Sequence, residues 1–202
     1  AGLPVDAIFG PDSLHMLNRL GDVGPGQPVA AVREHESLLT RNPNLDNKQV
    51  VLGEGGGLGS IINEFSRELT ARNLRVEVIS HYDERQHAQL SNSLDADLYF
   101  GITSSSQDLR SISYFSNQRY TSPGGVSLAN TLHERFLPIL GEGLETVGRA
   151  NQALRETRMP AIVLTVGPTS DLIACGPDLA ATAADAIVSW LTEPYVDEKN
   201  SE

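Results

Sequence analysis

One short segment concentrates the side chains that most often bind metals or move protons. His81, Asp83, Glu84 and His87 lie close together in the sequence. On a helix, the six positions between the two histidines correspond to about 600° of rotation, so the two rings face apart. Asp83 and His87, four residues apart, would then share one face. The spacing favours a surface helix cap with an ion pair, and a metal site is the alternative interpretation.

A glycine-rich turn follows the first strongly apolar run, in the segment VVLGEGGGLGS. A turn of this kind between a strand and a helix is where dinucleotide-binding folds hold phosphate groups. With Gly53 and Gly55 as the first pair of that fingerprint, the third glycine belongs at position 58, which is Leu58. The mismatch disfavours nucleotide binding and favours glycines that serve backbone geometry alone.

Consecutive hydroxyl residues from Thr103 to Ser106 follow another apolar run. No G-x-S-x-G turn surrounds them, and no His and Asp can be assigned as partners of a nucleophile. A polar loop at the end of a parallel strand is therefore the favoured interpretation. The histidines at positions 15, 35 and 133 are scattered, and we interpret each as a surface or core-edge residue.

Composition narrows the class of protein. The chain has 202 residues, of which 40% are hydrophobic, and a net charge of −11. The negative charge disfavours nucleic acid and anionic membranes as partners. The single cysteine, Cys175, cannot close an internal disulfide, so a reducing compartment fits best. No run approaches the roughly 18 apolar residues that span a bilayer, so no transmembrane segment is expected.

The segments that must position these residues alternate between strand-like and helix-like patterns from Lys48 onward. Five short apolar or alternating runs predict strands, and the segments between them carry apolar residues at three- and four-residue spacing, which is typical of helices. This alternation predicts a three-layer α/β/α domain with a mostly parallel sheet. The predicted strands are 49–53, 74–80, 96–102, 111–116 and 161–167; the predicted helices are 60–73, 83–94, 125–140, 148–158 and 178–191.

The chain outside this domain divides into three parts. Residues 1–26 hold one amphipathic helix and a Pro/Gly linker, and VDAIFGPDS resembles the closing segment of a helical peptidoglycan-binding repeat. Residues 27–47 contain a charged helix from Val29 to about Thr40, which either braces the main domain or stands solvated between domains. Residues 48–192 form the α/β domain, and residues 193–202 form an acidic tail.

Four segments of the main domain, taken in order, resemble the zinc-dependent N-acetylmuramoyl-L-alanine amidase family. VVLGEGGGLG takes the place of V-V-I-D-P-G-H-G-G, and His87 to Asp97 resembles R-x4-N-x3-A-D. LYFGITSSS takes the place of L-F-V-S-I-H-A-N-S, and LRETRMPAIVLTVGPTSD resembles L-R-x-T-x-x-P-A-V-L-V-E-x-G-F-x-S-N. The resemblance covers roughly residues 48 to 191, and it implies the amidase fold.

The resemblance also implies where the chemistry of the family would lie. Its zinc is held by His, Glu and His, and a further Glu serves as acid and base. The first His falls on Gly56, the second on Thr103 and the catalytic Glu on Thr165, while the loop with the Glu ligand is missing. Neutral hydroxyl groups are poor zinc ligands and cannot act as the base near pH 7. We therefore expect no zinc and no amidase activity, only a degenerate polar cleft of Gly55, Gly56, Gly57, Thr103, Ser104 and Thr165.

A repeat remnant joined to an inactive amidase-like domain resembles, more narrowly, the CwlM-like regulators of actinobacteria. This likeness implies a cytoplasmic phosphoprotein that regulates peptidoglycan precursor synthesis without hydrolysis. The implied partners are the UDP-N-acetylglucosamine enolpyruvyl transferase, a Ser/Thr protein kinase, a forkhead-associated domain protein and a lipid II export protein. The implied phosphothreonine falls on Thr192, with Thr182 as the next candidate. The alternatives are a muropeptide- or precursor-binding module and a residual amidase.

Overall fold

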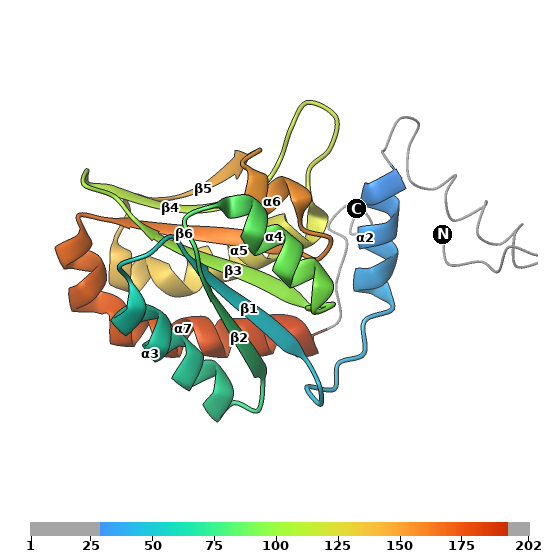
Figure 1. Cartoon of the computed structure of the whole chain (residues 1–202), viewed down its shortest axis with the longest axis horizontal. Helices are drawn as coiled ribbons and strands as arrows, with labels where there is room; N and C mark the ends of the chain where they lie inside the picture. The colour runs from blue at the N-terminus through green and yellow to red at the C-terminus, as the bar shows by residue number, and fades with distance from the viewer. Residues whose placement is uncertain (1–28, 194–202) are drawn as a thin grey trace, which may run out of the picture.

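A computed structural model describes residues 29–193 of the chain. The predicted repeat remnant at 1–26 and all but the first residue of the predicted acidic tail at 193–202 lie outside the described residues. Within them, one mixed sheet is covered by helices on both faces (Figure 1).

The sheet has six strands in the order β2-β1-β3-β6-β4-β5. All neighbouring strands are parallel except β4 and β6, which are antiparallel. The prediction of a mostly parallel sheet is confirmed. The carboxyl ends of β1, β2, β3 and β6 therefore meet at one edge. The strands are β1 (Gln49–Glu54), β2 (Arg75–Ser80), β3 (Leu98–Ser104), β4 (Leu109–Phe115), β5 (Leu144–Arg149) and β6 (Ala161–Gly167).

Strand β5 corrects the sequence analysis, which predicted five strands and placed a helix over 148–158. Only Leu144 of this strand is buried, so the segment has neither an apolar run nor a regular alternation. It lies at the end of the sheet, where one neighbour, β4, supplies the pairing that its own sequence does not signal. The helix that follows, α6 (Gln152–Glu156), is short and begins after Asn151, whose side chain accepts from the Leu154 amide.

Helices cover the sheet in two layers, which confirms the predicted three-layer fold. Figure 1 shows α3 (Gly59–Ala71), α5 (Pro123–Leu140) and α7 (Thr169–Thr192) on one side, with α4 (Glu84–Ser93) and α6 on the other. The larger apolar core lies under α3, α5 and α7, where Phe65, Phe100 and Phe136 are fully buried. Each buried side chain of this size contributes about 1.5–3 kcal/mol to folding.

Local capping sets where α4 and α5 begin. Asp83 precedes α4 and accepts a hydrogen bond from the Arg85 amide. Ser122 precedes α5 and accepts from the Gly125 amide, and Pro123 follows at the first helical position. Gly141, with φ of 78°, ends α5 in a conformation that glycine adopts readily. These residues set the start of α4 and both ends of α5.

Among the described residues, one helix, α7, is long and apolar enough to cross a membrane. One side of α7 is packed within the fold: Leu172, Leu179 and Ile187 are fully buried and belong to the larger core, whereas Ile173 is exposed. Helix α7 lies against both α3 and α5. This packing is typical of the core helix of a globular domain.

Candidate functional site

The parallel pairing brings three of the predicted cleft segments to one edge of the sheet. Strand β1 ends in the turn of Gly55, Gly56 and Gly57, next to the end of β3. Thr103 on β3 lies directly opposite Thr165 on β6. These two threonines are neighbours because the strands are parallel and adjacent, although 62 positions separate them in the sequence.

Side-chain alternation extends this pair into a polar row across four strands. Thr165 is also paired with Ser111 on β4, and Ser111 with Glu145 on β5. All four side chains share the face covered by α4 and α6, because Tyr99, Val163 and Phe115, at even spacings from them, pack on that face. Thr103 and Glu145 are exposed, Thr165 is half-buried and Ser111 is buried. We call Thr103, Thr165, Ser111 and Glu145 the polar row.

Ser104 does not join the polar row. It follows Phe100 and Ile102 at even spacing, and these side chains pack under α3, α5 and α7. Its side chain is therefore directed to the opposite face from Thr103. Sequence reasoning missed Glu145 because β5 was not predicted. It predicted the strand that carries Ser111 but not the antiparallel pairing of that strand with β6, which places Ser111 beside Thr165.

The glycine turn has two different local environments. Gly56 and Gly57 have φ of 104° and 92°, which non-glycine residues rarely adopt. Gly55 has no unusual φ, and a Cβ atom there would meet nothing within 4 Å. All three residues are exposed. The turn therefore uses two of its glycines for backbone geometry, in agreement with the interpretation favoured from the sequence.

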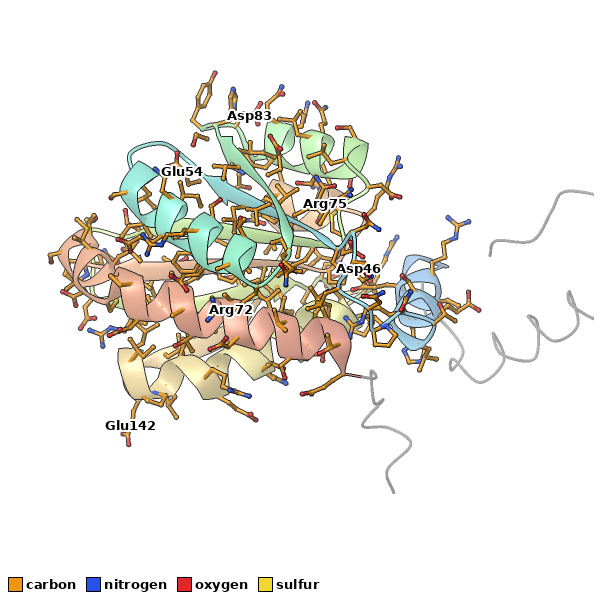
Figure 2. The ribbon with its side chains drawn as sticks, turned by 90° about the horizontal axis from the view of Figure 1, so that it is seen from below. Asp46, Glu54, Arg72, Arg75, Asp83 and Glu142 are labelled. Atoms are coloured by element: carbon orange, nitrogen blue, oxygen red, sulfur yellow. The ribbon has the colours of Figure 1, made fainter. Side chains whose placement is uncertain are left out.

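A buried carboxylate, Glu54, organises this turn from inside. Its Oε2 accepts from the Gly56 amide at 2.7 Å and from the Leu58 amide at 3.1 Å. Burial raises the pKa of Glu54, but hydrogen bonds from Ser80, Leu58 and Gly56 outweigh it and hold the pKa below its ordinary value. Figure 2 shows Glu54 at the start of α3, at the end of the sheet away from Asp46. The charge of Glu54 is thus committed to holding the turn and the start of α3.

Comparisons with known proteins place this architecture. No family model matches the sequence. The chain is similar to "N-acetylmuramoyl-L-alanine amidase CwlM" of Mycobacterium tuberculosis H37Rv, with 23% identity over 221 residues, covering 94% of this chain and 54% of that protein. The chain thus spans about half the length of this relative.

Two solved structures share the fold. The catalytic domain of the amidase CwlV from Bacillus (Paenibacillus) polymyxa var. colistinus has a TM-score of 0.53 at 20% identity, covering 72% of this chain and 96% of that one. The N-acetylmuramoyl-L-alanine amidase of Clostridium difficile 630 has a TM-score of 0.57 at 17% identity, covering 74% and 100%. This chain has the N-acetylmuramoyl-L-alanine amidase fold. The resemblance to that family and to CwlM, predicted from the sequence, is confirmed.

The residues that the resemblance assigns to two zinc-binding histidines and the catalytic glutamate of the amidase family do not fit a zinc ion. Gly56 has no side chain, and Thr103 and Thr165 offer neutral hydroxyl groups. Within residues 29–193, no group of three or more His, Cys, Asp or Glu side chains is arranged to hold a metal ion. Zinc prefers nitrogen, thiolate and carboxylate ligands in such sites. No step of a zinc mechanism can therefore be assigned to this amidase-like edge.

The His/acid segment serves structure in this amidase fold. Asp83 caps α4, as predicted, but the predicted Asp83–His87 ion pair is not formed. His87 is buried, with Nδ1 2.8 Å from the Tyr99 hydroxyl and Nε2 2.6 Å from the His81 carbonyl oxygen. The His81 carbonyl oxygen can only accept, so Nε2 is the donor of that bond, and in this tautomer Nδ1 accepts from the Tyr99 hydroxyl. Burial raises the pKa of Tyr99, so the hydroxyl keeps its proton. Both ring nitrogens of His87 are thus engaged.

The remaining chemistry-bearing residues are also accounted for by local structure. Glu84 accepts from the Gln152 amide at 3.0 Å and so joins α4 to the start of α6. His133 Nε2 lies 3.1 Å from the Leu144 carbonyl oxygen. In the hydroxyl run, Ser105 Oγ accepts from the Gln107 amide at 3.0 Å, which is a local polar turn. His35 is half-buried on α2, and His15 lies outside the described residues.

Proposed function

We propose that this chain is a catalytically inactive, amidase-like regulator of peptidoglycan precursor synthesis that acts in the cytoplasm. The observation that carries the proposal is the chemistry of three positions. Gly56, Thr103 and Thr165 stand where the family places two zinc-binding histidines and the catalytic glutamate. A glycine and two neutral hydroxyl groups supply neither a metal ligand set nor a base at neutral pH.

A protein of this kind acts by binding other proteins. In the proposal its target is the UDP-N-acetylglucosamine enolpyruvyl transferase, which the phosphorylated chain stimulates. A Ser/Thr protein kinase supplies the phosphate, and a forkhead-associated domain protein and a lipid II export protein are further partners. The similarity to CwlM over 94% of this chain supports this choice. These partners follow from the resemblance, and each is a separate target for the experiments below.

Thr192, the proposed phosphorylation site, is the last residue of α7. Its hydroxyl donates to the carbonyl oxygens of Val188 at 2.8 Å and Ser189 at 3.2 Å. A kinase would have to unwind this last helical turn to reach the hydroxyl. Phosphorylation adds about −1.5 to −2 charge, which is unfavourable at the negative end of a helix dipole. Phosphorylation of Thr192 would therefore loosen the end of α7.

A second candidate function, non-hydrolytic binding of a muropeptide or precursor, is favoured by one observation. Thr103 and Glu145 of the polar row are exposed and Thr165 is half-buried, so a ligand can reach two hydroxyl groups and one carboxylate along the row. Groups of this kind suit a ligand rich in amides and hydroxyl groups. Ser111, between Thr165 and Glu145 in the row, is 1% exposed and is closed to a ligand.

Metal content tests the loss of catalysis. The purified chain is incubated with excess zinc, dialysed and measured by elemental analysis, with the CwlV catalytic domain treated in parallel. We expect far less than one zinc per chain and no release of peptide from muropeptides. About one zinc per chain together with peptide release would revive the residual amidase and overturn the proposal.

Transferase kinetics test the regulatory role. The enolpyruvyl transferase is assayed with the chain before and after treatment with the kinase. Stimulation by the phosphorylated form alone is expected, and Thr192→Ala should abolish it while Thr182→Ala, in the body of α7, should not. If no form of the chain changes the transferase rate, the regulator proposal fails.

Calorimetry with muropeptides tests the second candidate. Binding by the polar row predicts that Thr165→Val, which removes one hydroxyl at constant shape, weakens the affinity about five- to tenfold, equivalent to one hydrogen bond. Ser104→Ala on the opposite face is the matched control and should bind as the wild type does. Absence of heat at millimolar ligand at two well-separated temperatures would exclude this function, because a binding enthalpy that is zero at one temperature is not zero at the other.

A further inference from the structure

Helix α2 (Val29–Leu39) docks at the edge of the domain opposite the glycine turn and the polar row. Figure 1 shows α2 beside the amino ends of β1 and β3. Val32 and Leu38 are buried, and Leu38 belongs to the larger apolar core. The sequence left open whether this helix braces the domain or stands solvated; in the structure it packs against α5.

The docking centres on one carboxyl group, Glu34, at the amino end of α5. Its Oε1 accepts from the Ser122 hydroxyl at 2.5 Å and from the Gly124 amide at 3.2 Å, and its Oε2 accepts from the Tyr120 hydroxyl. A Cβ atom on Gly124 would lie 2.9 Å from Glu34 Oε1, so the glycine keeps this space open. We call Tyr120, Ser122 and Gly124 the cradle.

A second contact fastens the segment that follows α2. Arg41 donates from Nη2 to the carbonyl oxygens of Trp190 and Glu193, the latter at 3.1 Å. Its guanidinium lies 4.2 Å from the centre of the Trp190 ring. A cation at the carboxyl end of a helix is favourable, so Arg41 stabilises the end of α7. Helix α2 is thus tied to α5 on one side and to α7 on the other.

The surroundings of Glu34 make its charge depend on pH near neutrality. Burial raises its pKa to about 7, and the hydrogen bonds from Ser122, Gly124 and Gly125 offset only part of this effect. The titratable group that faces Glu34 from the cradle is Tyr120. Helix α2, on which Glu34 lies, also carries Arg33, His35 and Glu36. Within the described residues, no charged side chain is among the groups that shift the pKa of Glu34.

We propose that α2 is a clasp whose closure on the cradle is coupled to proton uptake by Glu34. The protonated carboxyl stays in the cradle, because its hydroxyl can donate to Ser122 or Tyr120, which then turn from donors into acceptors. The ionised carboxylate is stabilised more by water than by the cradle, so closure of the clasp weakens as Glu34 loses its proton. Opening exposes Val32, Leu38 and the amino end of α5, and it strains the Arg41 contact with α7.

The direction of the pH effect follows from the two pKa values. The folded value of about 7 exceeds the ordinary 4.5, so the closed clasp binds the proton more tightly. Closure is therefore strongest below the ordinary pKa and is lost as pH rises through about 7. The difference between the two values corresponds to a change in the opening equilibrium of up to roughly 300-fold.

Hydrogen exchange of the full chain tests the clasp. Protection of peptides covering α2 and the cradle is measured between pH 5.5 and 8.5, corrected for the intrinsic pH dependence of exchange, with peptides of α3 as the internal reference for folding. We expect α2 protection to fall at least tenfold with rising pH while α3 stays protected. Glu34→Gln, an uncharged mimic of the protonated group, should keep α2 protected at every pH.

Glu142→Gln is the matched control, because Glu142 is exposed in the turn after α5 and far from the cradle (Figure 2). It should reproduce the pH dependence of the wild type. Constant α2 protection in the wild type would overturn the proposal. So would a Glu34→Gln chain that loses α2 protection at all pH values, because the carboxylate itself would then hold the clasp. None of these outcomes depends on zinc binding or on the transferase.

Discussion

Replacement of Gly53 by alanine is expected to destabilise the fold far more than replacement of its neighbour Gly55. Gly53 lies on β1, on the face covered by α4. A Cβ atom there would overlap the Tyr99 hydroxyl and His87 Nδ1, and would lie 2.8 Å from Tyr99 Cε2. These are the two partners of a buried hydrogen bond of 2.8 Å. The methyl group therefore strikes the contact that fixes α4 on the sheet.

The expected magnitude is the sum of two effects. Overpacking a well-filled core costs about 1–3 kcal/mol. Separating Tyr99 from His87 leaves buried polar atoms without partners, which costs about another 1–3 kcal/mol. Gly53→Ala should thus lose about 2–6 kcal/mol of unfolding free energy, a large share of the stability of a typical domain. Gly55→Ala, whose Cβ meets nothing, should stay within about 0.5 kcal/mol of the wild type.

Urea denaturation measures both variants, followed by far-ultraviolet circular dichroism and by fluorescence of the single tryptophan, Trp190. Tyr99→Phe removes the hydroxyl that the new methyl group would strike, so the double variant with Gly53→Ala should be less destabilised than the sum of the two single changes. Equal urea midpoints for Gly53→Ala and Gly55→Ala would refute the reasoning. Equal midpoints would mean that the structure around Gly53 can accommodate a methyl group without loss of stability.

Two further changes test how the elements are held. Glu54→Gln should lower stability by about 1.5–3 kcal/mol at neutral pH, because an amide accepts more weakly from the Gly56 and Leu58 amides. The folded pKa of Glu54 is lowered, so its contribution to stability is present above the ordinary pKa and is lost as pH falls. The urea midpoints of the variant and the wild type should therefore converge at acid pH. A constant difference between the two midpoints would contradict this. Arg41→Ala should lower the thermal midpoint and raise hydrogen exchange at the end of α7, since it removes the contacts with Trp190 and Glu193; unchanged exchange there would show that the cap contributes nothing.

The sequence predicted the layers of this fold because each layer has a local periodic signal. The buried runs of β1, β3 and β6 are continuous and apolar, and α3 and α5 repeat their apolar residues at helical spacing. Motif order then led to the amidase fold, and the threonines at positions 103 and 165 led to the proposal that a zinc ligand and the catalytic glutamate of the family are missing. These inferences need only the identity of the residue at each place along the chain.

Other features depend on which distant segments meet, and no local pattern encodes that. Strand β5 is an edge strand with one buried residue, so only its pairing with β4 identifies it as a strand. The same pairing places Glu145 at the end of the polar row that begins at Thr103. The environments of the Glu34 and Glu54 carboxyl groups could not be predicted from the sequence either. In the sequence Glu34 is one charged residue of a charged helix, yet Ser122 and Gly124, about 90 positions away, donate hydrogen bonds to its carboxyl group. Charge state and hydrogen bonding depend on burial and partners, and tertiary packing alone decides both.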